Sequence, residues 1–110
     1  MPGLTPLERE TLAHFAVRLR QFFGSRVRNV QLFGSKARGT ATPDSDVDVL
    51  VIMDQLTWSD EKAIHALAAH LLLETGVDIS AKVYSPLQIA DMQLQRNVFW
   101  QSLEHDALPL

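Results

Sequence analysis

The sequence predicts an α/β (α+β) fold, with a small mixed sheet of three to four strands and helices mainly on one of its faces. Apolar residues at helical spacing alternate along the chain with short β-branched runs, and this alternation is typical of such a fold. The chain has 110 residues, 46% of them hydrophobic and 21% charged, which is an ordinary globular composition. We therefore expect a single domain over residues 1–110.

Three helices are predicted from their start signals at residues 5–8, 57–60 and 85–88. Each signal begins with Thr or Ser and has Glu, Asp or Gln three residues later, as in a capping box. Gly24 and Gly76 are expected to end the first two helices, and residues 98–103 form a short amphipathic tail. The residues expected on the buried faces of the first two helices are Leu12, Phe15, Ala16, Leu19, Phe22 and Phe23, then Ile64, Leu67, Ala68, Leu71 and Leu72. Trp58 and Trp100 are expected to pack against the rest of the protein, although Trp100 and Phe99 also fit an exposed surface for a partner.

Strands are predicted at residues 26–33, 46–52 and 77–84, where β-branched and apolar residues are enriched. Between the first two, residues 36–39 predict a short helix or turn, and residues 40–45 predict a loop. The third strand alternates strictly, so one face carries Val77, Ile79, Ala81 and Val83, and the other carries Asp78, Ser80, Lys82 and Tyr84.

Composition excludes several classes of function. The net charge of −3 leaves no general footprint for nucleic acid, so no direct nucleic-acid binding is expected. The chain has no cysteine, which excludes disulfides and thiolate metal sites and fits a reducing compartment. Neither a signal peptide nor an apolar run of membrane-spanning length is apparent. We expect a cytoplasmic protein without a membrane partner.

The most informative motif is Gly34-Ser35 followed, after ten residues, by Asp46-Val47-Asp48. Glycine has no side chain, so a Gly-Ser turn after a strand allows backbone amides to approach phosphate oxygens. Asp46 and Asp48 are two residues apart in a β-branched run, which places both carboxylates on one face of a strand. Paired oxygen ligands of this kind suit Mg²⁺. The motif predicts a site for a nucleoside triphosphate and a metal ion.

Together with an aspartate on a third strand, this set resembles the polymerase-β-like nucleotidyltransferases. The turn at residues 34–39, the segment 45–51 and the strand start at 77–79 look, more narrowly, like the minimal nucleotidyltransferase (MNT) antitoxins, and the resemblance covers nearly the full chain. It implies one minimal nucleotidyltransferase domain over residues 1–110. It also implies a helical HEPN-type toxin ribonuclease as partner, inactivated by transfer of AMP from ATP to a tyrosine hydroxyl.

The resemblance implies a role for each residue of the motif that would hold the nucleotide. Gly34 would allow the backbone to approach the triphosphate, and the Ser35 hydroxyl and amide would hydrogen-bond its oxygens. Lys36 and Arg38 would add positive charge beside the phosphates, although both also fit a solvated turn.

The resemblance further implies that Asp46, Asp48 and Asp78 are catalytic and metal-binding. Asp46 and Asp48 would bridge two Mg²⁺ ions, and Asp78 would ligate the second ion or accept the proton of the attacking hydroxyl. Asp78 also fits a plain ion pair with Lys82 on the same strand.

Two other functions remain open from the residues. One is an antitoxin that binds and occludes its toxin without catalysis. A more distant one is a small-molecule nucleotidyltransferase of the aminoglycoside type. Because three clustered carboxylates repel one another unless they hold cations, the sequence favours a catalytic protein.

Overall fold

The computed structural model describes residues 3–40 and 45–110, so the predicted loop lies largely outside the described residues. The chain folds as an α/β domain with a four-stranded mixed sheet in the order β3-β2-β1-β4, as the sequence predicts. β1 is antiparallel to β2 and β4, and β2 is parallel to β3. In chain order the elements are α1 (Pro6–Phe23), the 3-10 helix η1 (Gly24–Arg26), β1 (Val27–Phe33), α2 (Gly34–Arg38), β2 (Val47–Met53), α3 (Trp58–Thr75), β3 (Ile79–Tyr84), α4 (Pro86–Leu94), α5 (Val98–Asp106) and β4 (Leu108–Pro109).

The three predicted helix starts are confirmed, each as a complete capping box. Thr5, Thr57 and Ser85 accept hydrogen bonds from the backbone three residues on, and the side chain at that position accepts one back from the cap. Each reciprocal pair satisfies two backbone groups that a helix start otherwise leaves unpaired. The caps therefore determine where α1, α3 and α4 begin.

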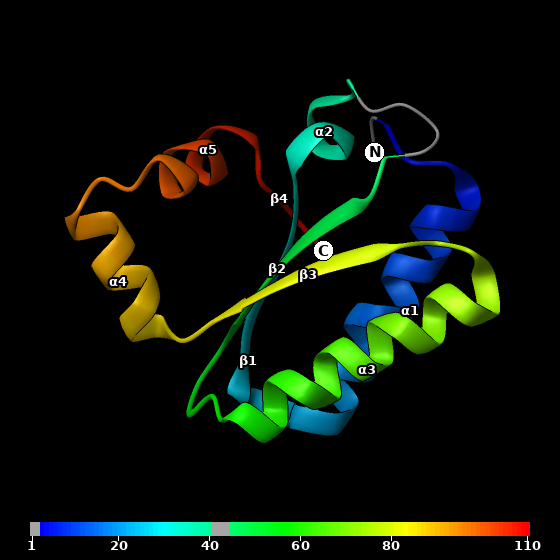
Figure 1. The fold of residues 1–110 in the computed structure, drawn as a ribbon, viewed down its shortest axis with the longest axis horizontal. Coiled ribbons are helices and arrows are strands. Elements are labelled where there is room, and N and C mark those ends of the chain that lie inside the picture. Colours follow the sequence, from blue (N-terminus) through cyan, green and yellow to red (C-terminus); the bar gives the residue numbers. More distant parts are fainter. Residues whose placement is uncertain (1–2, 41–44) are drawn as a thin grey trace.

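The sheet has two unequal faces. α1 and α3 lie side by side across one face (Figure 1) and enclose the main core. The other face carries a smaller cluster of Phe33, Leu50 and Leu103, through which α5 covers part of the sheet. The main core includes Leu12, Phe15, Leu19, Val30, Leu32, Val49, Val51, Ile64 and Leu71. Of the described helices, none combines the length and apolar character needed to cross a membrane.

Three of the predicted packing residues are instead exposed: Phe22 at 78%, Trp58 at 74% and Leu72 at 40%. Phe22 and Leu72 each neighbour a residue that faces inward, and successive residues on a helix are rotated by about 100°. Phe23 and Leu71 take the inward positions, so their neighbours turn toward solvent. Trp58 is the first residue of α3, directly after the cap residue Thr57. Trp100 does pack, against the smaller cluster.

Candidate active site

Strand pairing brings the motif residues to one edge of the sheet. Phe33 at the end of β1 pairs with Asp48 near the start of β2, and Asp48 pairs in turn with Ser80 on β3. The amide of Val47 donates a hydrogen bond of 2.9 Å to the carbonyl oxygen of Asp78. The C-terminal end of β1 and the N-terminal ends of β2 and β3 therefore meet, and Gly34 follows directly on the first of them.

Gly34 is in direct contact with the carboxylate of Asp48. Its backbone has φ +74°, which L side chains rarely adopt, and a Cβ added there would collide with Asp48 Oδ2. Only glycine meets both conditions without strain. The Gly-Ser turn and the β2 carboxylate are therefore one packed unit, with Ser35 in the first turn of α2.

The three aspartates are clustered like charges. Asp46 is exposed and lies immediately before β2, Asp48 is half-buried, and Asp78 lies immediately before β3. Burial and then the charge of Asp46 raise the pKa of Asp48, while the charges of Lys82 and Arg38 oppose that rise. Partial desolvation, the charge of Asp46 and a side-chain hydrogen bond with Asp46 raise the pKa of Asp78. The charge of Asp46 thus makes Asp48 and Asp78 harder to ionise, a cost that a bound cation would remove.

The carboxylates fit a magnesium ion shared with a substrate. In the described residues, no three His, Asp or Glu side chains are gathered closely enough to hold a metal ion by themselves. Mg²⁺ does not require such a cage, because it is commonly bound by one or two carboxylates together with waters and substrate phosphates. Asp46 and Asp48, beside the Gly34–Ser35 turn, are oxygen donors of this kind.

Lys36 is turned into the protein. Its ammonium lies 2.8 Å from Oε2 of Glu8 on α1, and the two side chains are only 3% and 11% exposed. Sequence reasoning missed Glu8 as part of this site. The capping box marks Glu8 as an N-terminal helix residue, but nothing local predicts a lysine partner 28 positions away.

Arg38 lies beside the carboxylates, where its charge lowers the pKa of Asp48. Its side chain is 44% exposed and donates a 3.0 Å hydrogen bond to Asp106 at the end of α5. Asp106 was also missed, because it is 68 residues away in the sequence. Arg38 therefore links α2 to α5 while keeping its charge near the site.

Lys82 belongs to the same electrostatic environment. It is exposed on β3, opposite Leu50 of β2 in the strand register, and its charge lowers the pKa of Asp48. No ion pair joins it to Asp78 in residues 3–40 and 45–110. The alternating exposure of β3 is as the sequence predicts, with Ile79, Ala81 and Val83 buried.

The structure thus brings the Gly34–Ser35 turn and the aspartates of the motif together at one edge of a mixed sheet. Comparison with known sequences identifies the family. The family described as "Nucleotidyltransferase domain" matches residues 13–98. The chain belongs to the nucleotidyltransferase family.

Two proteins of Methanocaldococcus jannaschii are similar in sequence. "Putative protein adenylyltransferase MJ0604" is 36% identical over 78 residues, which is 71% of this chain and 74% of that protein. "Putative protein adenylyltransferase MJ1305" is 33% identical over 82 residues, or 72% of this chain and 56% of that protein. The chain thus matches little more than half the length of the second relative.

Solved structures share the fold. The "Crystal structure of the toxin-antitoxin with AMP-PNP" superposes with a TM-score of 0.57 and 22% identity, covering 87% of this chain and 69% of that one. The "Crystal structure of a putative nucleotidyltransferase from Sulfolobus solfataricus" superposes with a TM-score of 0.50 and 16% identity, covering 94% of this chain and 75% of that one. At these identities the likeness establishes a common fold.

Proposed function

We propose that this chain is the antitoxin of a toxin-antitoxin pair and inactivates its toxin by transferring AMP from ATP to a tyrosine hydroxyl. The toxin would be a HEPN-type protein, and both proteins would act in the cytoplasm. Relatives in sequence are named as protein adenylyltransferases, and structural neighbours are described as toxin-antitoxin proteins, one of them with AMP-PNP. The observation that carries the proposal is the meeting of the Gly34–Ser35 turn with the aspartates at one sheet edge.

In this reaction the acceptor oxygen attacks the α-phosphorus of ATP. A new oxygen–phosphorus bond forms, the bond from the α-phosphorus to the bridging oxygen of the β-phosphate breaks, and pyrophosphate leaves. The Gly34 and Ser35 amides and the Ser35 hydroxyl would bind the triphosphate, with Arg38 adding positive charge nearby. Catalysis of this kind depends on positioning and charge neutralisation rather than on a covalent intermediate.

The carboxylates hold the metal in this proposal. Asp46 and Asp48 would bind two Mg²⁺ ions, which when bound neutralise phosphate charge and lower the pKa of the attacking hydroxyl. Asp78 would ligate the second ion or accept the proton of the acceptor. Partial desolvation first, and then the charge of Asp46 and a hydrogen bond with it, raise the pKa of Asp78 in the absence of a metal ion.

The acceptor would come from a separate protein. After β3 the described chain forms two helices of nine residues each, and α5 is used to cover the sheet through Leu103. The proposal of a protein acceptor instead of a small-molecule one is supported by the relatives in sequence, which are named as protein adenylyltransferases.

Intact-mass spectrometry of the partner protein tests the proposal. The product of the neighbouring open reading frame would be incubated with this chain, ATP and Mg²⁺, and in parallel with the Asp46→Asn/Asp48→Asn variant. A partner heavier by whole AMP units only with the unmutated chain is the expected result. An unmodified partner that co-purifies and loses its ribonuclease activity would contradict it and favour an antitoxin that acts by occlusion.

A further inference from the structure

Glu8 uses both of its carboxylate oxygens, for two different elements. Oε1 accepts a 2.8 Å hydrogen bond from the backbone amide of Thr5, which completes the cap of α1. Oε2 lies 2.8 Å from the ammonium of Lys36 on α2. The Glu8 side chain therefore caps the start of α1 and also holds α2 against α1 through Lys36.

The Glu8–Lys36 pair is buried to an unusual degree for two charged side chains, at 11% and 3% exposure. Lysine is almost never fully buried without a partner, because removing its charge from water is costly. Burial acts to raise the pKa of Glu8, but hydrogen bonds from Lys36 and Thr5 and the charge of Lys36 outweigh it and lower that pKa. The carboxylate is consequently ionised at neutral pH, and the contact is a true ion pair.

A second contact fixes the same helix. Gly3 has φ +80°, and a Cβ added to it would collide with the backbone carbonyl oxygen of Lys36. Leu4 and Ala37, the neighbours of these two residues, are both buried in the main core. Figure 1 shows the segment directly before α1 lying next to α2. The segment before α1 and the first turn of α1 together support α2.

α2 needs such support because it has only five residues, too few for an isolated helix to be stable in water. Ser35, immediately before Lys36, belongs to the turn that would bind phosphate, and groups of this kind act only when held within about 0.5 Å of their working positions. We propose that Glu8 is a positioning residue for nucleotide binding: through Lys36 it holds α2, and hence the Gly34–Ser35 turn, against α1. This inference rests on the proposed function, and it assigns Lys36 to the support of the turn instead of to a phosphate.

Binding of AMP-PNP with Mg²⁺, measured by calorimetry, tests this role on three variants of the full chain. Glu8→Gln keeps an oxygen for the Thr5 amide but loses the charge, Lys36→Met keeps the length of the side chain, and the third variant combines both. Each single change is expected to weaken binding about tenfold, and the double variant about as much as either, because the two residues act as one unit.

Two results would overturn the inference. If Lys36 touched phosphate directly, Lys36→Met would weaken binding while Glu8→Gln bound like the unmutated chain. If neither changed affinity, the pair would have no positioning role. An unmutated chain that did not bind AMP-PNP would instead contradict the proposed function, so the two failures are distinguishable.

Asp60→Asn is the matched structural control. Asp60 occupies the same position in the capping box of α3 and also pairs with a basic side chain, Arg26. The control is expected to lower the unfolding temperature and to leave the affinity for AMP-PNP unchanged. An equal loss of affinity in Asp60→Asn and Glu8→Gln would show a general effect of destabilisation and contradict a positioning role.

Gly3→Ala gives an independent check should Glu8→Gln fold poorly. The added methyl group would push against the carbonyl of Lys36, so Gly3 and α2 can no longer keep this close contact although both charges remain. Weaker binding of AMP-PNP is expected, and unchanged binding would contradict the proposed support of α2.

Discussion

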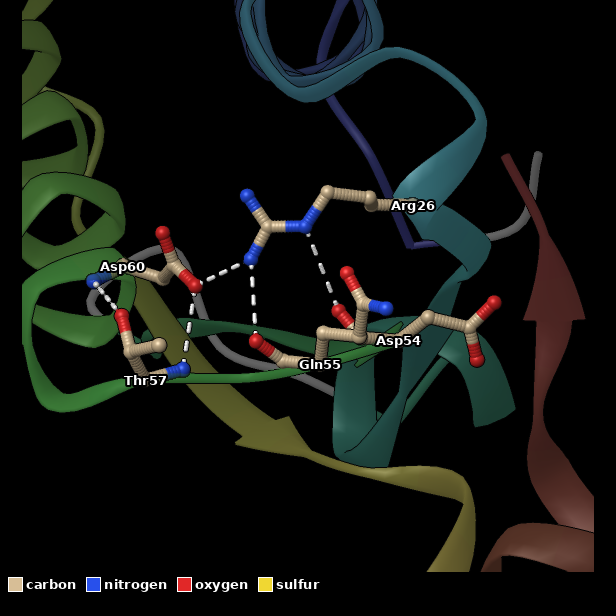
Figure 2. Close-up of polar contacts among 5 residues, drawn as sticks. All are labelled: Arg26, Asp54, Gln55, Thr57 and Asp60. Carbon is tan, nitrogen blue, oxygen red and sulfur yellow. Dashed lines mark hydrogen bonds and ion pairs between the residues drawn. The ribbon is translucent and has the colours of Figure 1, made fainter.

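At each end of β1, a carboxylate in a helix cap forms an ion pair with a basic side chain, but the two pairs differ in their surroundings. At the site end, Glu8 in the cap of α1 pairs with Lys36 on α2. At the other end, Asp60 in the cap of α3 pairs with Arg26 in η1 (Figure 2). A strand of seven residues separates η1 from α2, which is about 20 Å.

The two pairs differ in burial and in what else they hold. Arg26 is 34% exposed, and it also donates hydrogen bonds to the carbonyl oxygens of Asp54 and Gln55, the latter at 3.1 Å. Figure 2 shows its guanidinium bridging the connection between β2 and α3. Lys36 is 3% exposed and is fixed on the helix that follows Gly34. One pair closes a connection of the fold, whereas the other holds the element that would bind phosphate.

The largest expected effect comes from removing a carboxylate at the site end. Asp48→Asn should lower AMP transfer about a thousandfold, because phosphate charge is no longer neutralised. The folded protein disfavours the charge of Asp48, since burial and Asp46 raise its pKa. Replacing this carboxylate with a neutral amide should therefore leave the unfolding temperature, measured at pH 7 without Mg²⁺, equal to or higher than that of the unmutated chain. A transfer assay and thermal unfolding check both parts, and a destabilised variant would contradict the metal-binding role.

Substituting one glycine at each end of β1, Gly34 beside the site and Gly24 at the opposite end, sharpens the comparison. Gly34→Ala should reduce transfer about a hundredfold, because the new methyl group collides with Asp48 and displaces the turn. Gly24, beside η1, also has positive φ but nothing within 4 Å of an added Cβ. Gly24 has φ +62° and ψ −137°, outside the left-handed α region, so Gly24→Ala should cost only backbone strain, of about 2 kcal/mol. Equal activity of the two variants in the transfer assay would show that close packing at Gly34 is irrelevant to the reaction.

Stability should distinguish the two ion pairs as well. Lys36→Met leaves Glu8 largely buried and without its partner, which typically costs about 3 kcal/mol. Arg26→Met removes a pair whose cation is partly in solvent, and about 1 kcal/mol is expected. Urea denaturation measures both values. The reverse order would mean that burial does not set the strength of these contacts.

The smallest expected effect is on how the unfolding temperature falls as the solution becomes acidic. Hydrogen bonds and charge outweigh burial and lower the pKa of both Glu8 and Asp60. As the pH falls, the unfolded chain binds protons before the folded chain does. Both pairs therefore stabilise the folded protein fully above the ordinary carboxyl pKa values of about 4, and they lose this stabilisation as the pH falls through the lowered pKa values. Unfolding temperatures measured from pH 6 to about pH 3 should fall less steeply for Glu8→Gln than for the unmutated chain. Parallel profiles would contradict the ionised pair.

Sequence reasoning reached the features that depend on neighbouring residues. The caps at Thr5, Thr57 and Ser85 follow from pairs three residues apart, and the alternation in β3 follows from the strand period. The meeting of Gly34 with Asp48 was predictable in outline, because two strands joined by a short connection pair antiparallel. The family followed from the same motif.

The remaining features depend on distant partners. Lys36 was expected at a phosphate and pairs with Glu8 in the structure, and whether it also touches nucleotide stays a prediction. Arg38 and Asp106 meet only after α5 has folded back onto α2. Trp58, the first residue of α3, is 74% exposed instead of packed. A single sequence carries no local signal for such tertiary contacts.

The most direct test of the central claim compares two samples of ATP with the partner protein, one radioactively labelled at the α-phosphate and one at the γ-phosphate. With the unmutated chain and Mg²⁺, label from the α-phosphate alone is expected on the partner, and Asp48→Asn should transfer this label about a thousandfold more slowly. Label arriving from the γ-phosphate, or none from either with the unmutated chain, would contradict AMP transfer by this site.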